Sequence, residues 1–245
     1  VGIGCSNHRS LIVPAGVTLS MAAGTVVKSG MNCTGWGGAP SIAVNGGSLV
    51  ATGQAGNPVQ ITSISDDSRG GDTNRDGGLT APSSGSGVYI SVSGVAPRLD
   101  VRYLELPFGG VSGDLCGGCN DLSPDFGPVQ SIIANSMVGS QIYVSGQHPV
   151  SITDSSIKGG LYVRQDGGAS TLVVSGNTVT GGTIQVWAVR NPPTSVEPVV
   201  SNNTVTDGGY GSAVVINATR LNPAKLTGNR ATGSTVAQLA LAGSL

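Results

Sequence analysis

Residues 177–181 read NTVTG and residues 203–207 read NTVTD, and the same pattern recurs in three other segments. Those segments are NSMVG (135–139), SSIKG (155–159) and NRATG (229–233). Every copy has a small polar residue followed two positions later by an apolar one, and the apolar positions are 20, 22, 26 and 26 residues apart. A period of this size predicts a repeat architecture in which each copy belongs to one coil of a solenoid.

Short apolar segments accompany each copy of the pattern. Those that follow it are 141–145, 161–164, 183–189, 212–216 and 236–242. Those that precede it are 129–133, 150–153, 172–175 and 199–201. They are rich in Val and Ile, alternate between apolar and polar residues and are interrupted by Gly, Asn and Pro, which is typical of strands and not of helices. Three short strands per coil of about 20–26 residues predict an all-β fold, a right-handed parallel β-helix.

The small polar residue of the pattern has a structural interpretation. A single coil cannot bury its apolar face alone, so coils must stack, and the corners between strands favour Gly and Asn because these residues tolerate positive φ. Asparagine recurs at Asn135, Asn177, Asn203 and Asn229. We predict that these four side chains form an internal ladder of amide hydrogen bonds, which would serve stability and not catalysis.

Composition excludes several classes of protein. The 245 residues are 38% hydrophobic and 10% charged, with a net charge of −1, which permits a packed core and differs from disordered chains. The 12 Lys and Arg are scattered singly, so nucleic acid is not an expected partner. No apolar run reaches the ~20 residues of a membrane span. Abundant Gly, Ser, Thr and Asn favour a secreted bacterial protein, extracellular or at the cell surface.

The first half of the chain carries a resemblance. Residues 11–30 read LIVPAGVTLSMAAGTVVKSG, residues 41–63 read SIAVNGGSLVATGQAGNPVQITS, and DDSRGGDTNRDGG follows at 66–78. With the later coils, these stretches resemble the right-handed parallel β-helix repeat modules of bacterial secreted and cell-surface proteins over nearly the whole chain. The resemblance implies a fold and says little about chemistry.

The resemblance also bears on domain organisation and partners, because such modules are often arranged in tandem. We expect one β-helix domain over 1–245, with 66–86 and 107–128 as loop excursions. Residues 239–245 (LALAGSL) do not resemble a polar cap, so the chain is expected to be a piece of a longer solenoid or to adjoin another module. Other solenoid modules of the same or a neighbouring chain are the expected partners, with polysaccharide as a further possibility.

The loop excursion at 66–86 contains a candidate calcium site. Asp72, Asn74 and Asp76 offer oxygen ligands at alternate positions and Gly77 follows, as at positions 1, 3, 5 and 6 of an EF-hand loop. Position 12 falls on Ser83 instead of a glutamate, so Asp66 and Asp67 are the candidates to complete the ligand shell. The alternative is a solvated glycine-rich loop held by Asx turns, which needs no ion.

The four cysteines are the other candidates for a metal or redox site. They are Cys5, Cys33, Cys116 and Cys119. A redox role for Cys116 and Cys119 would require a helix N-terminus, and zinc would require two further soft ligands; the sequence around them indicates neither. We therefore predict the disulfides Cys5–Cys33 and Cys116–Cys119, in an oxidising compartment.

Catalysis has weaker support. Enzymes that cleave acidic polysaccharides on a β-helix resemble one another in aspartates clustered on neighbouring coils. The densest charged cluster in this chain is Arg98, Asp100, Arg102 and Glu105, and no carboxylate pair recurs at one strand position in successive coils. Arginine and aspartate alternating along a strand are more often a solvated pair than an active site. No catalytic residue is predicted.

Two other surface functions remain open. Trp187 would serve as a stacking platform for sugars if it is exposed, or would fill a wide coil if it is buried. The outward threonines of 178–180 and 204–206 resemble an ice-binding array, although threonine is also a good strand residue. The sequence favours a non-catalytic, calcium-stabilised structural or adhesive module. A polysaccharide lyase, glycoside hydrolase or carbohydrate binder that uses the outer groove is the alternative, and an ice-binding surface is a minor one.

Overall fold

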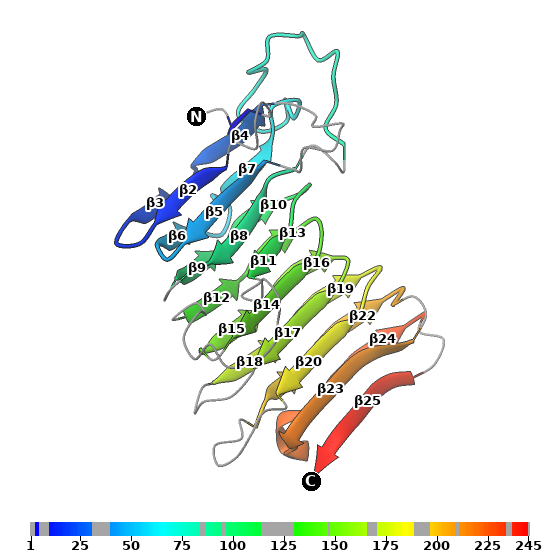
Figure 1. Cartoon of the computed structure of the whole chain (residues 1–245). Helices are drawn as coiled ribbons and strands as arrows, with labels where there is room; N and C mark the ends of the chain where they lie inside the picture. The colour runs from blue at the N-terminus through cyan, green and yellow to red at the C-terminus, as the bar shows by residue number, and fades with distance from the viewer. Residues whose placement is uncertain are drawn as a thin grey trace.

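The chain forms a right-handed parallel β-helix, in which every named pair of strands is parallel and three sheets surround one core (Figure 1). The computed structural model describes residues 3–4, 10–30, 40–83, 87–94, 97–113, 130–146, 148–165, 171–188, 197–208, 211–233 and 237–244. Strands β2 and β5 lie at one end of the stack, and β23 and β25 lie at the other (Figure 1). The predicted fold class is therefore confirmed.

The strands of each sheet follow one another at every third place in the chain, except for the last steps, β22 to β24 and β23 to β25. Sheet 1 contains β1 (Ile3–Gly4), β4 (Val26–Gly30), β7 (Val59–Ser63), β10 (Leu104–Leu106), β13 (Met137–Val138), β16 (Ser156–Lys158), β19 (Thr178–Thr180), β22 (Thr204–Thr206) and β24 (Arg230–Thr232). Sheet 2 contains β2 (Leu11–Pro14), β5 (Ser41–Asn45), β8 (Tyr89–Ser93), β11 (Val111–Gly113), β14 (Ile142–Gly146), β17 (Leu161–Gln165), β20 (Ile184–Ala188), β23 (Ser212–Arg220) and β25 (Ala237–Ser244). Sheet 3 contains β3 (Thr18–Ala22), β6 (Ser48–Thr52), β9 (Arg98–Arg102), β12 (Gln130–Ala134), β15 (Val150–Thr153), β18 (Leu172–Ser175) and β21 (Val199–Ser201). A short 3₁₀ helix, η1 (Pro223–Lys225), follows β23.

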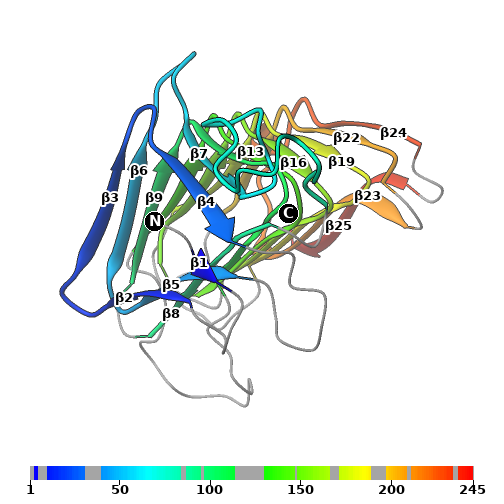
Figure 2. The ribbon, with the colours of Figure 1, turned by 90° about the horizontal axis from the view of Figure 1, so that it is seen from above.

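The core consists of aliphatic rows that run along the solenoid. Alternate residues of each strand face inward, and the inward residues of successive strands are register partners. One such row in sheet 2 is fully buried and comprises Ile90, Val111, Ile142, Leu161, Ile184 and Val214. Burying a side chain of this size stabilises the fold by about 1.5–3 kcal/mol. Figure 2 shows the three sheets enclosing this interior, with β3, β6 and β9 on one side.

Coil length differs between the two halves of the chain. In the second half, Val150 pairs with Leu172 and Val173 with Val199, within the predicted 20–26 residues per coil. In the first half some coils are longer, since Leu19 pairs with Leu49 and Leu49 pairs with Leu99. Residues 64–83, which follow β7, form an insertion that extends beyond β4 (Figure 1).

Part of the second predicted excursion lies in a coil. Residues 107–113 belong to the coil, since Val111 in β11 is the register partner of both Ile90 and Ile142. Gly109 fits here because an added Cβ would lie 1.8 Å from the carbonyl oxygen of Val88 on the preceding coil. The rest of the predicted excursion, 114–128, lies outside the described residues.

The corner between sheets 3 and 1 contains a ladder of side-chain hydrogen bonds. The Oδ1 atom of Asn203 accepts from the backbone N–H of Asn177 at 3.0 Å, and the Oδ1 atom of Asn229 accepts from the backbone N–H of Asn203 at 3.2 Å. Each amide nitrogen donates to a backbone carbonyl, as Asn203 does to Val174 at 2.9 Å. The oxygen and the nitrogen of each side-chain amide are therefore both hydrogen-bonded within the stack.

Asn135 does not take part in this ladder. It is exposed with a φ of 51°, and the next residue, Ser136, is buried in the ladder position instead. The Ser136 hydroxyl accepts from the N–H of Leu104, and the Ser155 hydroxyl accepts from the N–H of Ser136, each at 3.1 Å. The predicted alignment was one residue out of register here, because Val138 and not Met137 pairs with Ile157. A shift of one residue exchanges the inner and outer faces of a strand.

Candidate metal centre

The loop that follows β7 is anchored on the outer face of sheet 1. The Lys28 side chain on β4 is buried, and its Nζ donates to the carbonyl oxygen of Gly71 at 2.6 Å. Arg69 forms an ion pair with Glu105 on β10 at 3.0 Å, and Glu105 also accepts from the Gln60 amide on β7 at 3.0 Å. Contacts to three neighbouring strands therefore hold the base of the loop.

Asp66 belongs to this anchor. Its carboxylate accepts hydrogen bonds from Thr62 Oγ1 at 2.6 Å and from Ser68 Oγ, and it lies 3.4 Å from Arg69. Burial acts to raise the pKa of Asp66, but the hydrogen bonds from Ser68 and Thr62 and the charge of Arg69 outweigh it, and the pKa lies below its ordinary value. With these partners, Asp66 faces the sheet and not the candidate calcium site.

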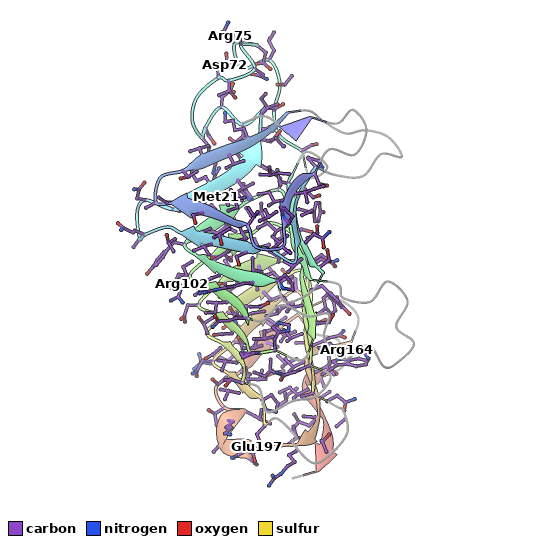
Figure 3. The ribbon with its side chains drawn as sticks, turned by 60° about the vertical axis from the view of Figure 1, so that its left-hand side comes forward. Met21, Asp72, Arg75, Arg102, Arg164 and Glu197 are labelled. Carbon is purple, nitrogen blue, oxygen red and sulfur yellow. The ribbon has the colours of Figure 1, made fainter. Side chains whose placement is uncertain are left out.

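Three carboxylates converge above the anchor. Ligand oxygens of Asp67, Asp72 and Asp76 all lie within 4.8 Å of one another. Asp67 also approaches Gly78, where an added Cβ would lie 3.7 Å from Asp67 Oδ2. Gly78 is the seventh residue of the loop counted from Asp72, the position at which an EF-hand loop contributes a backbone carbonyl. Figure 3 shows Asp72 at the tip of the loop, away from the coils.

The backbone of the loop is wound around these carboxylates. Asp72 accepts from the backbone N–H groups of Asp76 at 3.2 Å and Gly77 at 2.9 Å. Asp76 accepts from the N–H groups of Gly78 at 2.8 Å and Thr80 at 3.0 Å, as well as from the Thr80 hydroxyl. Left-handed φ angles at Arg75 and Gly77 permit this tight path. The Asx-turn geometry expected of an ion-free loop is therefore present and also positions the acidic side chains.

Two oxygens in this cluster lack a partner. Asp67 Oδ1 and Asn74 Oδ1 are buried atoms without a hydrogen-bond donor, although the Asn74 amide nitrogen donates to Asp76 at 2.7 Å. Buried acceptors are normally satisfied by protein, water or an ion. Desolvation, followed by the charges of Asp72 and Asp76, raises the pKa of Asp67 even though Lys28 opposes this effect. Carboxylate and amide oxygens are the type of ligand that hard divalent cations prefer, so Asp67, Asp72, Asn74 and Asp76 are a candidate ligand set.

The other charged cluster offers no comparable chemistry. Asp100, on the outer face of sheet 3, is held by Arg98 at 3.1 Å and by Arg102 at 2.9 Å. Glu105 lies on sheet 1 and pairs with Arg69, whereas Asp100 lies on sheet 3. The two carboxylates are therefore on different sheets although they are close in the sequence. These contacts describe a carboxylate fixed by two arginines and not an acid–base pair.

The remaining predicted sites have different outcomes. The four cysteines, and with them both predicted disulfides, lie outside the described residues; they are Cys5, Cys33, Cys116 and Cys119.

Thr178 and Thr204 are register partners, and their side chains face outward. Val179 and Val205, the next residues along the two strands, face inward and are buried. The adjacent strands carry Ser156 and Lys158 on one side and Arg230 on the other, which limits the threonine array.

A buried polar cluster in the interior was not predicted from the sequence. Ser131 occupies an inward position of β12, and its hydroxyl lies 3.3 Å from Nε2 of His148. The Gln165 amide donates to the His148 carbonyl oxygen at 3.0 Å, and His148 Nδ1 and Gln165 Oε1 have no partner. Burial lowers the pKa of His148 to about 4. The one sequence feature that indicates this cluster is Ser131, which lies in a row with the apolar residues Leu99 and Val150.

The His148 cluster predicts acid sensitivity. Unfolded His148 binds a proton below a pH of about 6.5, whereas folded His148 binds one only near pH 4, so unfolding takes up a proton in this interval. We expect the free energy of unfolding to fall by up to about 3 kcal/mol from pH 6.5 to pH 4. Urea melts of wild-type protein and His148→Gln at several pH values measure the difference. An equally steep decline in His148→Gln would assign the loss to other groups.

Comparisons with known proteins found no match: no family model, no curated protein and no solved structure resembles the chain significantly. Within the described part of the chain, no helix has the length and apolar character needed to cross a membrane.

Proposed function

We propose that the protein is a non-catalytic, extracellular β-solenoid module with a structural and adhesive role, stabilised by calcium. Calcium would bind at Asp67, Asp72, Asn74 and Asp76. The observation that carries this proposal is the convergence of three carboxylates on a loop that is tied to three strands of one sheet through Lys28, Glu105 and Thr62. An ion at this position would join an exposed loop to the stacked coils and would leave the core unchanged.

The stacked coils suit a spacer. Within each sheet, every strand except those at the two edges is hydrogen-bonded to strands of the preceding and following coils. The aliphatic rows continue from coil to coil, and the polar ladder fixes one corner. Such a solenoid resists bending because every coil contacts both neighbours over three sheets. An extended, stiff body separates whatever is attached at its two ends.

An extracellular location accords with the candidate ion site. The carboxylates lie on a largely exposed loop with one turn of ligands, and modules of this kind outside the cell bind calcium at about 0.1–1 mM. The low content of charged residues and the four cysteines are also compatible with an oxidising environment.

The edge strand β25 supports a further solenoid coil as partner. Leu239 and Leu241 continue the inward rows of Val214 and Ile216 but are 38% and 47% exposed. An edge strand with exposed apolar side chains is a template for pairing with another strand. We expect Leu239→Lys combined with Leu241→Lys to reduce self-association in sedimentation velocity at high protein concentration. Unchanged association in this double variant would exclude β25 as the contact.

Two measurements test the structural assignment against the enzymatic alternative. Small-angle X-ray scattering should give the elongated particle of a solenoid, and neutral and uronic-acid polysaccharides incubated with the protein, with and without calcium, should show no new reducing ends and no unsaturated product. Chain scission that is lost in Asp100→Asn would overturn the non-catalytic assignment. Wild-type protein with its calcium site intact should be used for both measurements.

A further inference from the structure

The outer face of sheet 2 carries aromatic side chains on successive coils. Tyr143 on β14 is the register partner of Tyr162 on β17, and Tyr162 is the partner of Gln185 on β20. Trp187, two residues further along β20, is 44% exposed and is the register partner of Arg164. Trp187 therefore points outward and does not fill a wide coil. Figure 3 shows Arg164 reaching away from the solenoid on the side opposite Arg102.

Glycines position two of the tyrosine rings against the sheet. A Cβ added to Gly160 would lie only 2.2 Å from Cε2 and 2.6 Å from Oη of Tyr162. The Tyr162 ring therefore lies beside Gly160 and occupies the space that a side chain there would need. In the same way, a Cβ at Gly110 would lie 3.2 Å from Cε1 of Tyr89. Tyr89 and Tyr162 are half-buried, so part of each ring remains accessible to solvent.

Apart from Arg164, the outward polar residues of sheet 2 are mostly small and uncharged. Outward positions of the same sheet are occupied by Asn45, Ser91, Ser93, Ser112 and Asn217. Within the described strands of sheet 2 there is no Asp or Glu, and the charged residues are Arg164 and Arg220. This face therefore combines aromatic surfaces with hydroxyl and amide groups and does not repel an acidic ligand.

We propose that Tyr143, Tyr162 and Trp187 form a platform that binds a linear polysaccharide along the solenoid axis. This inference deepens the adhesive part of the proposed function and rests on it. Neighbouring strands are about 4.8 Å apart, close to the length of one pyranose unit, so consecutive sugars meet consecutive coils. The apolar C–H face of each sugar packs on a ring, and its hydroxyl groups reach side chains such as Gln185 and Asn217.

A polysaccharide fits this platform better than a protein does. Protein interfaces have an apolar, fully buried centre, whereas Trp187 is the one exposed large hydrophobic side chain of the described strands β14, β17 and β20. Tyrosine and tryptophan present an apolar surface together with a polar group, which suits ligands that alternate C–H and O–H groups. The absence of carboxylates from the described strands of this sheet permits both neutral and uronate-containing chains.

Binding to soluble polysaccharides tests the platform. Affinity electrophoresis and calorimetry with a neutral β-glucan, a xylan and a polyuronate should show saturable binding to at least one of them, and the panel separates neutral from acidic chains. Trp187→Ala should weaken that binding by about tenfold or more. Gly160→Ala should also weaken it, because the new Cβ displaces the Tyr162 ring without removing it. Ile12→Ala, which removes an exposed side chain from the distant strand β2 of the same sheet, should leave binding unchanged.

The variants also separate this inference from the proposed structural role. Each variant is first checked by its melting curve, and Gly160→Ala retains all side chains of the platform if Trp187→Ala fails to fold. Absence of binding to the whole panel, or equal binding by wild-type, Trp187→Ala and Gly160→Ala, overturns the platform. Such a result leaves the calcium-dependent stability and the elongated shape of the module untouched, since neither depends on these rings.

Discussion

Replacing Asn203 by alanine is expected to lower the free energy of unfolding by about 4 kcal/mol. The substitution leaves the buried N–H of Asn177 without its acceptor and the carbonyl oxygen of Val174 without its donor. Each unsatisfied buried group costs about 1–3 kcal/mol. It also removes the bond from the Asn203 amide to Asn229 Oδ1 at 2.9 Å, so the ladder is interrupted between two coils. Equilibrium urea unfolding followed by circular dichroism measures the change.

Asn135 supplies the matched control for the ladder. The repeat pattern assigned Asn135 to the ladder together with Asn177, Asn203 and Asn229. Its side chain is exposed, however, and its backbone is left-handed. Asn135→Gly preserves the permitted φ and should change the stability by no more than about 0.5 kcal/mol. If Asn203→Ala costs no more than Asn135→Gly, the ladder does not hold the coils together.

Removal of calcium is expected to have a comparable effect. A ligand that binds only the folded state adds about 4 kcal/mol at a thousandfold excess over its dissociation constant. We therefore expect the melting temperature of the wild-type protein to rise with calcium and to fall on addition of a chelator. Differential scanning calorimetry at fixed protein concentration measures both shifts.

The adjacent residues Asp66 and Asp67 make this prediction specific. Asp67→Asn should abolish the calcium-dependent shift, and in chelator it should melt no lower than wild type, because it removes one of three clustered carboxylates. Asp66→Asn should melt lower because it weakens the contacts to Thr62 and Arg69, yet it should retain a shift with calcium. The reverse pattern in the two variants would place the ion on the other side of the loop.

Local sequence patterns predicted the parts of the fold that depend on one coil at a time. The Asn-Thr-Val-Thr segments identified the ladder corner because the apolar residue of each, Val179 and Val205, must face inward. In 135–139, Met137 and Val138 are both apolar, so the pattern leaves two registers open. The structure selects Val138 as the partner of Ile157, a choice that depends on contacts 19 residues apart.

The candidate site shows the same division. The spacing of Asp72, Asn74 and Asp76 suffices to predict a ligand loop, because all three lie within one turn. Choosing between Asp66 and Asp67 requires knowledge of the folded loop, in which Asp66 contacts Thr62 on sheet 1 and Arg69 of the loop itself. Contacts such as those from Lys28 to Gly71, and from Arg69 to Glu105, join residues that are far apart in the sequence and leave no local signal.

The aromatic platform depends still more on register. Tyr143 and Tyr162 are unremarkable strand residues in the sequence, and only the pairing of β14 with β17 brings them together. The sequence left Trp187 open between an exposed and a buried position, and the alternation of β20 decides in favour of exposure.

Isothermal titration of calcium into the protein tests the central claim most directly. We expect saturable binding at one site in wild-type protein and in Glu197→Gln, which removes a distant carboxylate that pairs with Lys225. We expect loss of that binding in Asp67→Asn. No binding to folded wild-type protein, or undiminished binding to Asp67→Asn, would contradict the claim.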